Sequence, residues 1–257
     1  MHIHLSHKST RLFIYLSAFF ICNAIIAECI GVKIFSLEKL FGHDSTNLRL
    51  FGIEGLSFNL TAGVLLWPLV FIFTDIINEY YGPRGVRMIS YIAAALIAYT
   101  FIMFVAAMQL PPADFWIQTN SNKGVPDMQQ AFSAIFGQGS WIIIGSLSAF
   151  IIGQIADVFV FHKIKKMTGE RLIWLRATGS TLVSQLIDSF VVLFIAFYVG
   201  QGWSLKLVSA ICVLNYIYKF MMAILMTPLI YLVHNRIEKY LGTDLAGEMR
   251  QAAMTDS

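Results

Sequence analysis

Long apolar stretches separated by short polar segments dominate the chain up to about residue 233. An α-helix needs about 20 mostly apolar residues to cross the hydrocarbon core of a bilayer. Hydropathy divides the chain into runs of about this length. The runs lie near residues 12–32, 57–81, 86–108, 141–161, 178–199 and 207–233. The pattern therefore predicts an all-α, polytopic membrane protein with six transmembrane helices.

The composition agrees with this setting. Hydrophobic residues make up 57% of the chain, charged residues only 13%, and the mean hydropathy is +0.69. Soluble domains carry roughly 25% charged residues, about twice as many. Because no repeat and no polar domain interrupts the pattern, we expect residues 1–257 to form a single transmembrane domain.

The basic residues predict the orientation, because cytoplasmic loops carry an excess of Lys and Arg. If both termini are cytoplasmic, twelve basic residues fall inside, five fall outside and Lys219 lies within a span. The net charge of +3 therefore reflects topology, and we expect no nucleic-acid partner. The chain is expected to lie in the inner (cytoplasmic) membrane.

The loops between the predicted helices say less about function than the helices do. Residues 33–56 and 109–140 form long outer loops that are either lids or passive connectors. Residues 82–85, with the sequence GPRG, predict a tight inner turn. The tail after Gly242 is expected to be mobile.

Polar side chains inside the apolar runs are the main functional signal. A carboxylate at bilayer depth costs roughly 2.5–3.5 kcal/mol on insertion scales, so it should face a polar interior. On the second, fourth, fifth and sixth predicted helices the polar residues recur at helical spacing and form one seam per helix. This suggests that the four seams converge in the bundle. The polar residues are Asn23 and Glu28; Asp75, Asn78 and Glu79; Gln154 and Asp157; Thr181, Gln185 and Asp188; Asn215 and Lys219.

Several of these residues also have a purely structural explanation. Glu79 and Asp157 lie near the predicted inner boundary, where Arg84, Arg87, Lys163 or Lys165 could pair with them. Asn23, Gln154 and Asn215 could hydrogen-bond between helices. A role in energy coupling is the alternative to a structural role for Asn78, Glu79, Gln154, Asp157 and Asn215. Glu28 lies near the outer end of its span, where it could reach the lipid headgroups.

Asp188 and Lys219 are predicted at similar depth, near the middle of consecutive antiparallel helices. The two residues form either a buried ion pair that joins these helices or part of a binding site. These two interpretations are compatible.

Several motifs resemble the queuosine precursor transporter family, a group of vitamin-uptake-like transporters related to the substrate-binding components of energy-coupling-factor systems. The motifs are FTDIINEYYG at 73–82, GQIADV at 153–158 followed by FHK at 161–163, RATGST at 176–181 and SQLIDS at 184–189. Asn215-Tyr216, Lys219 and Thr227-Pro228 also fit. The resemblance implies six helices and import of 7-cyano-7-deazaguanine or 7-aminomethyl-7-deazaguanine across the inner membrane.

The chemistry of such a ligand suggests roles for the polar residues. A deazaguanine presents a ring N–H beside an exocyclic amine, and Asp188 or Asp75 could accept both hydrogen bonds. Trp67, predicted near the middle of the second span, is either an aromatic wall for the flat ring or a packing residue. The ring carbonyl needs donors, for which the candidates are Gln185, Asn23 and Lys219. An aminomethyl substituent would add a cation, which Glu28 or Asp75 could select.

Other functions remain as alternatives. An intramembrane enzyme is not favoured, because none of the six histidines lies well inside a span and neither H-E-x-x-H nor G-x-S-x-G occurs. We expect no metal and no cofactor. A channel or scaffold is a third class, and a substrate-binding component of an energy-coupling-factor vitamin importer is the nearest alternative.

The source of energy is open at this stage. Transport could use an ion gradient or a partner ATPase, or it could be facilitated. Ala93, Ala94, Ala95 and Ala98 could face such a partner or simply pack between helices. The expected partners are the small-molecule substrate and membrane lipids, and a homo-oligomer is left open.

Overall fold

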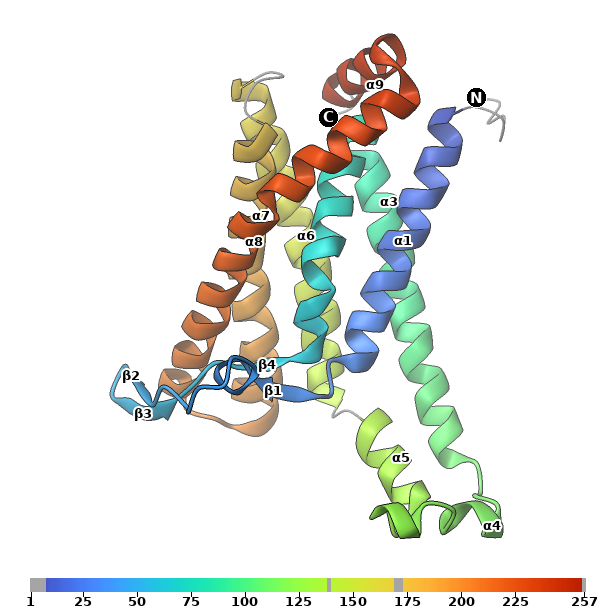
Figure 1. Ribbon diagram of the computed structural model, residues 1–257, viewed down its shortest axis with the longest axis vertical. Coiled ribbons are helices and arrows are strands. Elements are labelled where there is room, and N and C mark those ends of the chain that lie inside the picture. Colours follow the sequence, from blue (N-terminus) through green and yellow to red (C-terminus); the bar gives the residue numbers. More distant parts are fainter. Residues whose placement is uncertain (1–7, 138–139, 169–172, 256–257) are drawn as a thin grey trace.

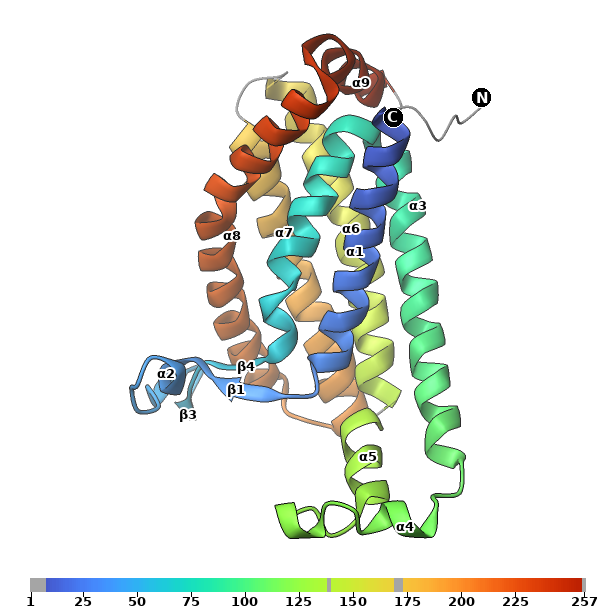
Figure 2. The ribbon, with the colours of Figure 1, turned by 45° about the vertical axis from the view of Figure 1, so that its right-hand side comes forward.

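The computed structural model describes residues 8–137, 140–168 and 173–255. Among these residues, five helices are long and apolar enough to cross a membrane, which confirms an all-α, multi-pass membrane protein. The helices are α1 (Lys8–Ile30), α3 (Trp67–Gln109), α6 (Ser140–Thr168), α7 (Ile173–Leu193) and α8 (Leu205–Leu241). They lie side by side along the long axis (Figures 1 and 2). The start of α1 and the last helix, α9 (Thr243–Thr255), lie at one end of the bundle, here called the terminal end, and the strands lie at the opposite, loop end (Figure 1).

Helix α3 contains a sharp reversal at Gly82. The residue adopts φ 69° and ψ −177°, and Pro83 follows it. The chain turns back at this point, so residues 67–81 and 83–109 form two antiparallel limbs (Figure 1). A positive φ strains most side chains, and glycine adopts it without cost. The tight turn predicted for residues 82–85 is therefore confirmed.

The tail after Gly242 is ordered, contrary to expectation. It forms helix α9 (Thr243–Thr255), in which Ala246 and Ala253 are buried. Helix α9 packs closely on the α3 turn. A Cβ atom at Gly82 would lie only 3.2 Å from the carbonyl oxygen of Ala253. The polar composition of the tail concealed a short amphipathic helix.

The second helix begins later than predicted. Strand β4 (Asn59–Thr61) pairs antiparallel with β1 (Ile34–Ser36), and the 3₁₀ helix η1 (Ala62–Leu65) follows. The predicted start at residue 57 is therefore wrong, because this apolar segment forms a strand at the loop end. Helix α3 starts at Trp67 with Pro68 in its first turn, where a missing N–H costs no hydrogen bond.

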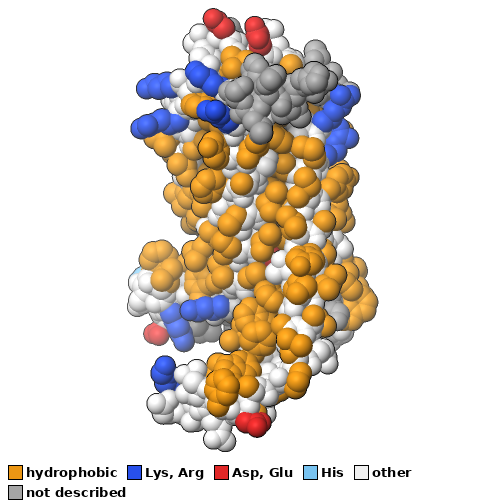
Figure 3. Space-filling model, turned by 90° about the vertical axis from the view of Figure 1, so that its right-hand side faces the viewer, with side chains coloured by type: hydrophobic (Ala, Val, Ile, Leu, Met, Phe, Trp, Pro, Cys, Tyr) orange, Lys and Arg blue, Asp and Glu red, His pale blue; other side chains and the backbone are white. Residues whose placement is uncertain are grey.

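The remaining boundaries shift less. Helix α1 starts at residue 8 rather than 12, α6 continues to 168 rather than 161, and α8 continues to 241 rather than 233. A π-helical turn, η3 (Phe194–Val199), follows α7. A broad band of apolar side chains covers the face shown in Figure 3, with basic side chains near both ends.

Glu38 organises the first long loop. This loop contains α2 (Leu37–Leu40) and the hairpin of β2 (Leu48–Leu50) and β3 (Ile53–Leu56). The Glu38 carboxylate accepts hydrogen bonds from the Phe58 N–H at 2.8 Å and from the hydroxyls of Ser36 and Thr46, each at 2.9 Å. Burial alone would raise its pKa, but these hydrogen bonds favour the ionised form and lower the pKa to about 2.

The second long loop holds α4 (Asp114–Ile117), the 3₁₀ turn η2 (Ser121–Lys123) and α5 (Met128–Phe136). Phe136 packs against Phe104 of α3 with ring centroids 4.6 Å apart. The loop is therefore anchored to the end of α3 by aromatic contact.

Candidate functional site

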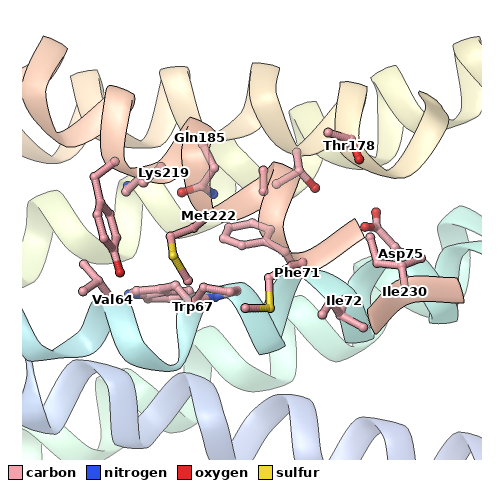
Figure 4. Close-up of a pocket in the computed structure, with 15 residues that line it drawn as sticks. Val64, Trp67, Phe71, Ile72, Asp75, Thr178, Gln185, Lys219, Met222 and Ile230 are labelled. Carbon is pink, nitrogen blue, oxygen red and sulfur yellow. The ribbon is translucent and has the colours of Figure 1, made fainter. Parts of the chain in front are cut away.

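A cavity opens between the first limb of α3, helix α7 and helix α8. It contains about 500 Å³ of space, part of it open to the surroundings. Its lining combines apolar and polar side chains from all three helices (Figure 4). The lining residues are Val64, Trp67, Pro68, Phe71, Ile72, Asp75, Thr178, Thr181, Gln185, Tyr218, Lys219, Met222, Ala223, Met226 and Ile230.

The cavity has polar ends and an apolar middle. Gln185 and Lys219 lie toward one end, and Asp75 and Thr178 lie toward the other (Figure 4). Trp67 begins α3 and Phe71 lies one turn further along, with ring centroids 6.2 Å apart. Trp67 is thus at the start of its helix and not near the middle, but it does face the cavity. Such a site suits a flat, mostly apolar ligand with polar groups on its edges.

Gln185 carries an unused hydrogen-bond donor. The residue is only 4% exposed, and its Nε2 has no hydrogen-bond partner among the described residues. An unpaired buried donor costs about 1–3 kcal/mol. Because the side chain lines the cavity, a ligand acceptor would relieve this cost.

The ion pair expected between α7 and α8 is present. Lys219 Nζ lies 2.5 Å from Asp188 Oδ2, and the two side chains are 16% and 24% exposed. Lys219 also lines the cavity, whereas Asp188 is not among the lining residues. The structure therefore presents the ammonium group to the cavity and keeps the carboxylate behind it.

A second ion pair lies deeper in the protein. Lys165 Nζ is 3.2 Å from Glu79 Oε2 and also donates to the backbone carbonyl of Glu79 at 3.0 Å. The side chains are 1% and 3% exposed. The pairing alternative for Glu79 is thus confirmed with Lys165, but Lys165 is not an inner-loop residue, because α6 extends past it.

Buried polar residues between α3, α6 and α7 form what we call the sealed layer: Thr74, Asn78, Ser90, Gln154, Asp157 and Ser184. Gln154 Oε1 accepts weak hydrogen bonds from Thr74 at 3.4 Å and Ser90 at 3.5 Å. This contact joins both limbs of α3 to α6, so Gln154 is an interhelical bridge. Neither amide atom of Asn78 has a hydrogen-bond partner among the described residues.

Asp157 is the carboxylate of the sealed layer. It is 0% exposed and accepts a hydrogen bond from Ser184 at 3.2 Å. Within the described part of the chain its Oδ2 has no hydrogen-bond partner. Ser184 Oγ also lies 3.0 Å from the carbonyl oxygen of Thr181, a cavity residue. Helix α7 therefore contributes Thr181 and Gln185 to the cavity and Ser184 to the contact with Asp157.

Three candidates lie away from the cavity. The amides of Asn23 and Asn215 donate to Phe19 and Ile211 in their own helices, at 2.8 and 3.1 Å. Glu28 accepts a hydrogen bond from Ser146 of α6 at 2.6 Å. The structure thus links Glu28 to a neighbouring helix, whereas the sequence suggested either a contact with lipid headgroups or a role in selecting the substrate.

The sequence did not single out Phe71, Thr178 and Met222 as site residues. Phe71 lies four residues from both Trp67 and Asp75, and Thr178 lies three before Thr181, so both continue the seams at helical spacing. Met222 lies three residues after Lys219, so it also continues a seam, but as an apolar residue it was not counted among the polar candidates. Within the described ranges, no group of three His, Cys, Asp or Glu residues could hold a metal ion.

Comparison with known proteins gives a consistent result. The family described as "Putative vitamin uptake transporter" matches residues 61–233. The chain is 32% identical over 189 residues to the "Probable queuosine precursor transporter" of Bacillus subtilis, covering 72% of this chain and 73% of that protein. It is 25% identical over 190 residues to the "Queuosine precursor transporter" of Escherichia coli, covering 66% and 70%. No solved structure is significantly similar. Since the match takes in most of the apolar core, the chain belongs to the vitamin uptake transporter family.

Proposed function

We propose that this protein imports a queuosine precursor, 7-cyano-7-deazaguanine or 7-aminomethyl-7-deazaguanine, across the inner membrane. The names of the similar proteins from Bacillus subtilis and Escherichia coli support this substrate class. The observation that carries the proposal is the cavity, in which an aromatic wall lies between polar ends and the Gln185 amide has an unused donor. These features suit a flat heterocycle with polar edges.

The arrangement suggests how the ligand is held. Trp67 and Phe71 stack on the bicyclic ring. Asp75, which lines the cavity and is 3% exposed, accepts hydrogen bonds from the ring N–H and the exocyclic amine. Gln185 and Lys219 donate to the ring carbonyl. Asp188 orients Lys219 through their ion pair, so it acts on the ligand indirectly.

The proposal includes six membrane crossings with both termini in the cytoplasm. Two antiparallel limbs of α3 add a crossing to the count of long helices, and the start of α1 and helix α9 lie at the same end of the bundle. Arg84, Arg87 and Lys163 lie near that end, as the bias of positive charge requires; Arg171 lies outside the described residues. Reporter fusions at Ser257 and in the loop near Lys123 should give opposite locations, and identical locations would contradict this topology.

A proton gradient is the energy source that we propose, with Asp157 as the proton carrier. Two other core carboxylates, Asp188 and Glu79, form ion pairs with lysines, whereas Asp157 accepts a hydrogen bond from the neutral Ser184 hydroxyl and forms no ion pair with a lysine or arginine among the described residues. A buried carboxylate without a cation favours its neutral form. Because Ser184 of α7 contacts Asp157, a change in the protonation of Asp157 would act on the helix that also lines the cavity.

The direct test is rescue of queuosine-modified tRNA. The gene is expressed in a bacterial strain that lacks both precursor synthesis and its own transporter, with 7-cyano-7-deazaguanine or the aminomethyl compound in the medium. We expect modified tRNA to return at low precursor concentration and uptake to saturate. Linear, non-saturable uptake would indicate a channel, and no rescue by a membrane-inserted protein would refute the proposed function.

A further inference from the structure

A groove on the outside of the bundle, between the second limb of α3 and α6, lies apart from the cavity. It contains about 910 Å³ of space, much of it open to the surroundings. Its residues are Pro83, Arg87, Ile155, Val158, Phe159, His162, Lys163 and Lys166. Basic side chains thus gather at its terminal-end portion, and apolar side chains continue it toward the middle of the bundle.

The groove extends further along the same helices. An adjoining hollow shares Arg87, Ile155 and Val158 with it and adds Tyr91 and Ile151. Ile155 is 48% exposed and Phe159 is 67% exposed, as expected of side chains that face hydrocarbon. The two hollows adjoin and have cations at one end, and apart from Ser90 and Gln154 on the inner wall the side chains that continue them are mostly apolar.

The cations in the groove are available for a ligand. Arg87, Lys163 and Lys166 are exposed, and none of them forms an ion pair with a carboxylate among the described residues. Arg87 Nε donates only to the Pro83 carbonyl of its own helix at 3.3 Å, which leaves its terminal nitrogens available. This differs from Lys165, which lies on the same helix but is buried against Glu79.

We propose that this groove binds an anionic phospholipid of the cytoplasmic leaflet. The phosphate lies between Arg87 and Lys163, and an acyl chain follows Ile155 and Val158 toward Tyr91. Two features support this occupant: the positive charge without a carboxylate partner among the described residues, and the apolar side chains that continue the groove. Basic pockets between helices on the cytoplasmic side recognise anionic headgroups in this way.

The chain offers a matched control for the test. Arg87→Gln with Lys163→Gln removes one arginine and one lysine from the groove, and Arg236→Gln with Lys239→Gln removes the same charges from α8 at the same end. Arg236 and Lys239 are exposed and do not line the groove. Both double variants change the general attraction to an anionic surface equally, so a difference between them reports the groove.

Binding is measured by native mass spectrometry of the purified protein in detergent, with phosphatidylglycerol, cardiolipin or phosphatidylcholine added. We expect retention of the anionic lipids over phosphatidylcholine, and a loss of affinity on the order of tenfold in the groove variant but within about twofold in the control. Inorganic phosphate should not compete at comparable concentration, because it lacks the acyl chain. Equal losses in both variants, no preference for anionic lipid, or full competition by phosphate would each overturn the proposal.

Discussion

The two lysine–carboxylate pairs in the helical core have different surroundings. Glu79 and Lys165 are at most 3% exposed, and Lys165 makes a second contact with the backbone of its partner. Asp188 and Lys219 are 24% and 16% exposed, and Lys219 lines the cavity. Removing one member of a buried pair leaves a charge without compensation, which is costly in proportion to its burial. The deep pair should therefore govern stability, and the cavity pair should govern transport.

The largest effect is expected at the deep pair. Lys165→Met should lower the free energy of unfolding by about 3 kcal/mol, because the buried Glu79 carboxylate would lose its lysine partner. Thermal unfolding in detergent measures this change. The double variant Lys165→Met with Glu79→Gln should recover much of the loss, and a double variant as unstable as the single one would show that the pair is not the cause.

For the pair of Asp188 and Lys219, the effect of substitution on transport should be larger than its effect on stability. Lys219→Met should abolish precursor uptake but lower the free energy of unfolding by only about 1–2 kcal/mol, because water and ligand reach this pair. Adding Asp188→Asn should restore stability without restoring uptake. Uptake and thermal unfolding must be measured on the same preparations; additive losses of stability would mean that the two residues do not interact.

Asp157 extends the comparison to a carboxylate that has no lysine partner among the described residues. Asp157→Asn should change the free energy of unfolding by less than about 1 kcal/mol, because a neutral amide replaces a group that we expect to be neutral. In proteoliposomes the variant should lose accumulation driven by a proton gradient but retain exchange of substrate. Accumulation equal to wild type, with the same response to an uncoupler, would remove Asp157 from proton coupling.

Glu38 provides a reference carboxylate outside the membrane and should give the smallest effect. Its pKa is lowered to about 2 from an ordinary 4.5, so its contribution to loop stability is present above pH 4.5 and is lost as the pH falls toward 2. Glu38→Gln at neutral pH should increase amide hydrogen exchange at Phe58, by the equivalent of about 1 kcal/mol. The difference from wild type should shrink on acidification. Glu54→Gln is the control, since Glu54 and its partner Arg49 are both more than 70% exposed.

The sequence predicted the helices well where apolar content alone determines structure. The reversal at Gly82 and the pairing of Asp188 with Lys219 could also be predicted, because a Gly-Pro pair has few conformations and consecutive helices are antiparallel neighbours. The start of α3 could not be predicted from hydropathy. Residues 59–61 are as compatible with a paired strand as with a helix, and the partner strand lies more than 20 residues away.

The buried Lys165 shows a different limit. It lies in a basic segment, so it was counted with the inner loop, yet Gln154, Asp157, Phe161 and Lys165 follow a spacing of three, four and four that places them on one face of a helix. Extending the polar seam past the apolar run would have identified it. The cavity itself depends on how three helices pack, and no local pattern predicts that Lys219 faces it while Asp188 does not.

The central claim is that the cavity binds a 7-deazaguanine through Gln185, and calorimetric titration of the purified protein with 7-cyano-7-deazaguanine tests it most directly. Ser189→Ala is the control, because Ser189 lies one turn further along α7, is equally buried and does not line the cavity. We predict saturable binding by the wild type and by Ser189→Ala, with Gln185→Leu on the order of tenfold weaker, as expected for one buried hydrogen bond. No saturable binding by the wild type, or equal affinity in Gln185→Leu, would contradict the claim.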